Sequence, residues 1–103
     1  MKQKKIVIYY NEREVKKENG TRTEKDKKEF TLQHPGLGWY LDTMDQAKIK
    51  GEGVVTNSRY AWEQYLENVV VDPKMEISDF DKIDGGFDLA VKLMAECESF
   101  LTA

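Results

Sequence analysis

The sequence predicts an α+β fold that is mainly helical, with about three helices preceded by an N-terminal β-hairpin that carries a long mobile loop. Residues 6–10 are all β-branched or aromatic, which is typical of a strand. From residue 34 onward, apolar residues recur at the three- and four-residue spacing of helices. Between these parts, residues 11–28 are almost entirely polar and hold too little apolar side chain to fix a structure.

The hairpin is expected to fold back at Asn19-Gly20, because this dipeptide favours tight turns between strands. A return strand would follow the charged loop of residues 11–28. Because a two-stranded hairpin is only marginally stable by itself in water, we expect it to rest on the helices. The chain has 103 residues, the size of a single domain, which would span 1–103 with the hairpin in 1–33 and a helical body in 34–103.

The first helix is predicted to begin at His34-Pro35-Gly36. Proline is tolerated in the first turn because the N–H groups there have no hydrogen-bond partner within the helix. Its inward stripe follows the helical spacing and comprises Leu37, Tyr40, Leu41 and Met44. Trp39 lies about 160° away from the centre of that stripe, at ~100° per residue. The helix is expected to end at residues 50–53, and residues 54–55 would form a short connection.

The second helix is expected to begin near Asn57 or Ser58, since both residues are good N-caps. It would stop at Asp72-Pro73, since the residue before a proline avoids α geometry. The apolar face comprises Trp62, Tyr65, Leu66 and Val69. Tyr60 falls among the polar residues. Residues 74–84 are interpreted as a linking segment held by three apolar side chains, Met75, Ile77 and Phe80.

The last helix is predicted over residues 87–101 and is apolar around much of its circumference. One stripe comprises Phe87, Ala90, Val91, Met94, Cys97 and Leu101. A second stripe comprises Leu89, Leu93 and Phe100. Together the two stripes span an arc of roughly 200°, which is wider than the ~100° that a helix needs to face one core.

Composition excludes several classes of protein. A single cysteine, Cys97, rules out an intrachain disulfide and suits a reducing compartment. No apolar run is long enough to cross a membrane, and the apolar run after the N-terminal lysines is too short for a signal peptide. The net charge of −3 is unevenly distributed, because residues 1–28 carry ten Lys or Arg and five Asp or Glu, a balance of +5, which leaves −8 for residues 29–103.

Candidate catalytic and metal-binding residues are few. His34, the only histidine, has no identifiable acid–base partner, so we expect it to cap or pack at a helix start. Cys97 lies on an apolar stripe and is expected to be a buried thiol rather than a nucleophile. An acidic cluster lacks the ligand spacing of a calcium loop and suits helix capping instead: Asp79, Asp81, Asp84 and Asp88. The sequence therefore predicts a protein that is not an enzyme and has no cofactor and no metal.

The N-terminal cations allow a different function, a small nucleic-acid-binding regulatory protein. The residues that would serve it are Lys2, Lys4, Lys5, Arg13, Lys16, Lys17, Arg22, Lys25, Lys27 and Lys28. Five acidic residues interleave with them, whereas a groove binder concentrates positive charge on one face. Nucleic acid is therefore the less favoured partner.

Apolar residues that fall outside the predicted stripes suggest a protein-binding surface. The candidate partner-binding residues are Trp39, Tyr60, Leu89, Leu93 and Phe100. The alternative is that the hairpin covers Trp39 and that the other helices enclose the last helix. Both arrangements are compatible with a small three-helix domain.

Two segments resemble the tail assembly chaperones of long-tailed bacteriophages, particularly those of Gram-positive hosts. The first segment is Thr31-Leu32-Gln33-His34-Pro35-Gly36 with Trp39-Tyr40-Leu41 and Asp45. The second runs from Tyr65 through Val69-Val70-Val71-Asp72-Pro73-Lys74-Met75 to Asp79-Phe80-Asp81, and the chain closes with Phe100-Leu101 as family members do. The resemblance covers about residues 29–101 and leaves out the lysine-rich hairpin.

The resemblance implies a non-catalytic function in virion morphogenesis. Such chaperones bind the tape-measure protein, keep it soluble and recruit tail-tube subunits around it. They act in the cytoplasm of the bacterial host and are absent from the mature virion. Many are made in a short form and a longer frameshifted form, and this chain looks like the short form of a homo-oligomeric member.

Overall fold

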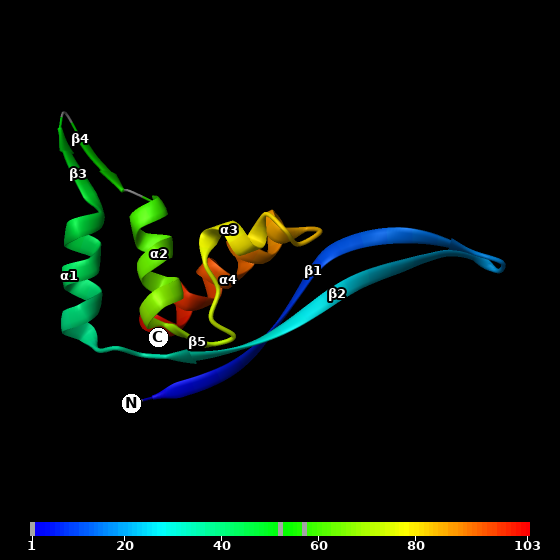
Figure 1. Cartoon of the computed structure of the whole chain (residues 1–103), viewed down its shortest axis with the longest axis horizontal. Helices are drawn as coiled ribbons and strands as arrows, with labels where there is room; N and C mark the ends of the chain where they lie inside the picture. The colour runs from blue at the N-terminus through cyan, green and yellow to red at the C-terminus, as the bar shows by residue number, and fades with distance from the viewer. Residues whose placement is uncertain (1, 52, 57) are drawn as a thin grey trace.

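The computed structural model describes residues 2–51, 53–56 and 58–103, and side chains in 2–46 and 59–103. The elements follow one another as β1 (Gln3–Lys17), β2 (Gly20–Gln33), α1 (Leu37–Ala47), β3 (Lys48–Gly51), β4 (Gly53–Thr56), α2 (Ser58–Asn68), β5 (Val70–Asp72), α3 (Ile77–Phe80) and α4 (Gly86–Leu101) (Figure 1). The fold is α+β, as predicted, but not mainly helical, because strands hold almost as many of the described residues as helices do.

The hairpin accounts for this correction. Residues 11–28, expected to be a mobile loop, belong to two long paired strands, and only Glu18 and Asn19 lie between Lys17 and its partner Gly20. The predicted turn at Asn19-Gly20 is therefore confirmed, with Gly20 at a φ of 121°. This polar stretch can form two paired strands because the hydrogen bonds of a strand ladder come from the backbone. Cross-strand ion pairs between its side chains add to the pairing.

The sheet gains a third strand that was expected to be helix. The β5 segment pairs antiparallel with β2, in the order β1-β2-β5, and places Val70 opposite Leu32. Helix α2 therefore ends at Asn68, four residues before the predicted stop at Asp72-Pro73. Three consecutive valines, 69–71, explain the earlier end, because β-branched side chains favour strands over helices.

Two further boundaries differ from those predicted. Helix α1 ends at Ala47, before the predicted end at residues 50–53, and the stretch that follows, including the short connection predicted at 54–55, forms a second small antiparallel sheet from β3 and β4. The linking segment 74–84 contains the short helix α3. Of the two N-caps proposed for the second helix, Asn57 lies outside the described residues and Ser58 is the first helical residue.

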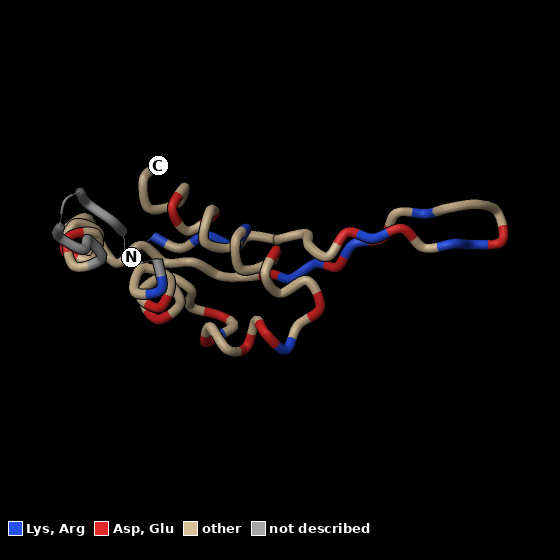
Figure 2. The backbone as a smooth tube through the Cα atoms, turned by 90° about the horizontal axis from the view of Figure 1, so that it is seen from above, with Lys and Arg blue, Asp and Glu red and all other residues tan. Residues whose placement is uncertain are grey.

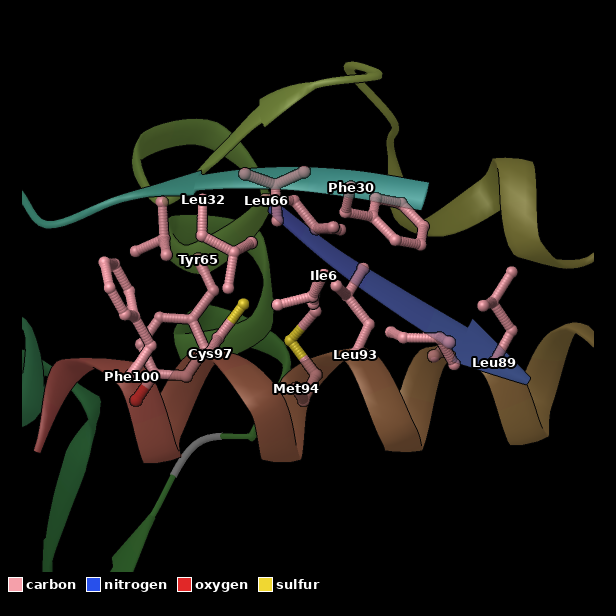
Figure 3. Packing of buried hydrophobic residues seen from close by; sticks show 14 of the residues in the cluster. Ile6, Phe30, Leu32, Tyr65, Leu66, Leu89, Leu93, Met94, Cys97 and Phe100 are labelled. Atoms are coloured by element: carbon pink, nitrogen blue, oxygen red, sulfur yellow. The ribbon is translucent and has the colours of Figure 1, made fainter. Parts of the chain in front are cut away.

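The core lies between the sheet and α4 (Figure 3). Alternate residues of the hairpin point toward this helix, so that Ile6, Ile8, Phe30 and Leu32 are buried while Val7 and Tyr9 remain exposed. Helix α4 begins at Gly86, within one residue of the predicted start, and ends at Leu101 as predicted. Its buried side chains come from both predicted stripes, because α2 and α3 also pack against it.

The inward stripe predicted for α1 is only half right, because Tyr40 and Met44 pack against the core and the two leucines do not. Leu37 and Leu41 are exposed to 68% and 56%. Trp39, expected to lie off the inward stripe, instead packs near Tyr65, with ring centroids 6.3 Å apart. Thr43 is buried on the same side. The inward face is therefore rotated toward the tryptophan, the larger apolar side chain, which contacts α2.

The distal half of the hairpin projects from the body as an arm, defined here as residues 13–24 (Figure 1). The molecule measures 56 × 36 × 23 Å, and its radius of gyration of 16.4 Å exceeds the ~13 Å typical of a compact chain of this length. None of the described residues 11–28 is buried, so the arm has no core of its own.

A β-bulge marks the base of the arm. The pairing register shifts between Tyr10 and Arg13, and Asn11 adopts a left-handed φ of 55°. The Asn11 side chain and the Arg13 guanidinium both donate hydrogen bonds to Asp26, and these bonds hold the pKa of the Asp26 carboxyl below its usual value. Lys92 of α4 donates from Nζ to the carbonyl oxygen of Tyr9 at 2.8 Å. Polar contacts thus fix the direction in which the arm leaves the body.

Candidate protein-binding site

The five candidate partner-binding residues do not form one surface. Leu89 and Leu93 are fully buried and Phe100 is 7% exposed, so the expectation that they extend an exposed apolar face is wrong. The wide apolar arc of α4 is instead filled by the sheet, α2 and α3 together. Trp39 and Tyr60 are half-buried on α1 and α2, and the Tyr60 hydroxyl donates to Gln46 Oε1 at 2.7 Å.

The exposed apolar residues of α4 are ones that the sequence pattern placed inward. Phe87 is 82% exposed and Val91, one turn further along, is 42% exposed. The width of the apolar arc indicated that some of its residues would remain outside the core. The sequence pattern could not predict which edge of the arc stays exposed, because that depends on the directions from which α2, α3 and the sheet approach the helix.

Phe87 borders a groove between α2, α3 and α4, which we call the helical groove. Its larger part, about 770 Å³, is lined by Arg59, Glu63, Leu66, Glu67 and residues 74–79. Its smaller part, about 120 Å³, is lined by Trp62, Leu66, Ile77, Phe80, Asp81, Phe87, Ala90 and Met94. Leu66 and Ile77 line both parts, so the two parts adjoin at these apolar side chains.

The local sequence explains why the groove stays open. After the cis Asp72-Pro73 bond the chain runs back beside α2 without regular structure until α3 begins at Ile77. Glu76 N donates to Asp79 Oδ2 at 2.8 Å, which caps this short helix and fixes the groove wall. Only Phe80 of α3 is buried, and Met75 and Ile77 stay partly exposed in the lining of the groove.

The rim of the groove is acidic. Its charged lining comprises Glu63, Glu67, Glu76, Asp79 and Asp81 against Arg59 and Lys74. Both cations are engaged locally, because Arg59 Nε pairs with Glu63 Oε1 at 2.7 Å and Lys74 Nζ donates to the Glu67 carbonyl oxygen at 2.6 Å. The groove therefore offers an apolar floor and a negative edge.

The candidate catalytic residues have structural partners. His34 Nδ1 accepts from Gly36 N at 3.0 Å, Nε2 lies 3.1 Å from the Leu101 carbonyl oxygen, and the ring meets Phe100 edge-on. The prediction that His34 caps or packs is thus confirmed. Cys97 is fully buried, as predicted. The carboxylate of Asp88 pairs with Lys92 at 2.9 Å, and in the described part of the chain no three acidic, histidine or cysteine side chains are grouped to hold a metal.

A half-buried carboxylate, Glu98, ties three helices together. The Tyr40 hydroxyl donates to Oε1 at 2.8 Å, and the Tyr65 hydroxyl donates to Oε2. The hydrogen bond to Glu98 raises the pKa of Tyr40, and burial followed by this hydrogen bond raises the pKa of Tyr65. Burial also raises the pKa of the neighbouring Cys97 thiol to about 12. These groups are held in the neutral form, which suits a structural role.

We expect the protein to lose stability above pH 9 because of Cys97. The ordinary pKa of the thiol is 9.0, and burial raises it to about 12 in the folded protein. Between these values the thiol ionises in the unfolded chain but not in the folded protein. Its contribution to the free energy of unfolding is therefore complete below pH 9 and is lost as the pH rises toward 12. The expected loss is about 1.4 kcal/mol per pH unit over this window. Urea unfolding between neutral and alkaline pH measures it. Cys97→Ala should show a smaller slope above pH 9, and equal slopes would contradict the prediction.

None of the helices in the described part of the chain has the length and hydropathy needed to span a bilayer. Comparisons of the chain with protein-family models, with curated proteins and with solved structures found no match.

Proposed function

We propose that the protein is a phage or prophage tail assembly chaperone that holds a helical segment of the tape-measure protein in the helical groove. The observation that carries the proposal is the 82% exposed Phe87 at the end of a groove with an apolar floor. A large exposed aromatic beside such a groove is the arrangement by which proteins bind the apolar face of a partner helix. The resemblance of residues 29–101 to these chaperones supplies the identity of the client.

The charge of the groove supports a chaperone role. An acidic rim disfavours contact between two such grooves, so the apolar side chains of the groove can be exposed without aggregation through them. A client helix that buries the floor would place its basic flanks near Glu67 and Glu76. The proposal extends, through the resemblance, to recruitment of tail-tube subunits, action in the cytoplasm of the bacterial host, self-association and absence from the mature virion.

Coexpression with the tape-measure protein of the same genome tests the proposal. Phe87→Asp should lower the soluble yield of the client and weaken its binding at least about tenfold, since truncation of a central hot-spot residue costs about 2 kcal/mol or more. Leu41→Asp is the matched control, because Leu41 is also an exposed apolar residue but lies on α1, away from the groove lining. Equal binding by wild type and Phe87→Asp would reject the groove as the client site.

A further inference from the structure

The sheet has one face that the helices leave uncovered, which we call the open face. It is formed by alternate residues of the two long strands: Lys5, Val7 and Tyr9 of β1 with Lys25, Lys27, Glu29 and Thr31 of β2. Directly paired residues share a face, and Tyr9 lies opposite Lys27 while Val7 lies opposite Glu29. Val7 is 45% exposed and Tyr9 49% exposed, whereas Ile6 and Ile8 on the other face are buried against α4.

An exposed tyrosine is the centre of the open face. The Tyr9 side chain is 49% exposed, and the Lys25 ammonium lies over one face of its ring, 4.9 Å from the ring centroid. Lys27 is its direct cross-strand partner. An aromatic ring that is flanked by two lysines on a sheet surface can stack on a base while the ammonium groups contact the adjoining phosphates.

The strand period separates charges that are mixed in the sequence. Glu24 and Asp26 alternate with Lys25 and Lys27 along β2, so they point to the opposite face. There they form ion pairs across the ladder, Asp26 with Arg13 at 3.3 Å and Glu24 with Lys17 at 3.5 Å. The lysines at 25 and 27 are thus left on the face that carries Tyr9.

The open face continues onto the arm. Lys16 and its partner Thr21 share it, as does the pair Glu14 and Thr23. Over both strands the face carries Lys5, Lys16, Lys25 and Lys27 against Glu14, Glu29 and the bulge residue Glu12, which alternates with Arg13. The acidic helical groove lies among the helices, which pack on the other side of the sheet. Figure 2 shows acidic residues along the helices and their connections, whereas basic and acidic residues alternate along the hairpin.

We propose that the open face binds single-stranded nucleic acid, with a base stacked on Tyr9 and phosphates contacting Lys25 and Lys27. A single strand is favoured over a duplex, because stacking on an exposed aromatic requires a base that is not already stacked within a helix. An acidic peptide would satisfy the lysines but would leave the tyrosine ring without a stacking partner. This site is distinct from the helical groove and does not depend on the function proposed for it.

Fluorescence anisotropy with the full chain tests the proposal, using labelled oligo-dT and oligo-U of about 12 nucleotides. Both should bind at about 50 mM salt and weaken steeply toward about 200 mM. Tyr9→Ala should weaken binding about tenfold or more, and Tyr9→Phe should retain it, because phenylalanine keeps the stacking ring. Lys27→Glu should weaken binding and reduce the salt slope by about 0.7.

The matched control is Lys82→Glu, which makes the same charge change at an exposed position next to α3. It should bind like wild type. The proposal is overturned if neither oligonucleotide binds at low salt, or if Tyr9→Ala and Lys27→Glu bind as tightly as Lys82→Glu. Equal affinity for a duplex or for polyglutamate would also overturn it. If Tyr9→Ala fails to fold, Lys27→Glu against Lys82→Glu decides the outcome.

Discussion

Replacing Gly86 by alanine is expected to lower the free energy of unfolding by about 3 kcal/mol, a large fraction of the 5–15 kcal/mol typical of a domain. A Cβ at this position would lie 1.8 Å from the Phe80 carbonyl oxygen and 2.8 Å from its carbonyl carbon. Both are backbone atoms, so no side-chain rotation relieves the contact. Phe80 is 6% exposed and anchored in the core, so the start of α4 or the end of α3 must shift.

Urea denaturation of wild type and variant measures this loss. Gly38→Ala is the matched control, because an added Cβ there meets nothing within 4 Å and the residue lies inside α1. Alanine is favoured over glycine in a helix, so Gly38→Ala should gain up to about 1 kcal/mol. Equal midpoints for the two variants would mean that α3 and α4 do not approach each other as closely as described.

Part of the hairpin could be predicted from the sequence, and part could not. Residues 6–10 and the Asn19-Gly20 turn were predicted because both depend on local preference. The ladder of the arm was missed, because its two strands hold a single apolar residue, Val15, and therefore show no alternation to detect. Backbone hydrogen bonds pair the two strands, and their register places oppositely charged side chains within reach of each other.

The candidate site was missed for a different physical reason. Helical spacing identifies which residues share a face, but the neighbours of the helix decide which face is buried. The last helix was predicted almost to its ends, yet its most exposed apolar residue is Phe87 and its buried residues include Leu89. Likewise, Leu37 was assigned inward although Trp39 occupies the contact with α2. Three elements pack on α4, and their directions of approach come from tertiary contacts alone.

Replacing Leu93 by alanine is the second substitution with a large expected effect. The side chain is fully buried near the middle of α4, facing the sheet (Figure 3). Its truncation leaves a cavity, because the surrounding strands and α2 can collapse only in part, and the expected loss of stability is about 3 kcal/mol. Val91→Ala is the matched control on the same helix. Since Val91 is 42% exposed, its truncation should cost less than about 1 kcal/mol.

The same burial decides how binding experiments on α4 must be interpreted. Leu93→Asp would place a carboxylate in a fully buried position within the hydrophobic core, so the variant should fail to fold. Loss of client binding by Leu93→Asp would then report unfolding, which circular dichroism detects. Phe87→Asp adds the same charge to the same helix at a position that is 82% exposed, so its fold should remain. A folded Leu93→Asp protein, or a Leu93→Ala variant as stable as Val91→Ala, would contradict the packing of α4 against the sheet.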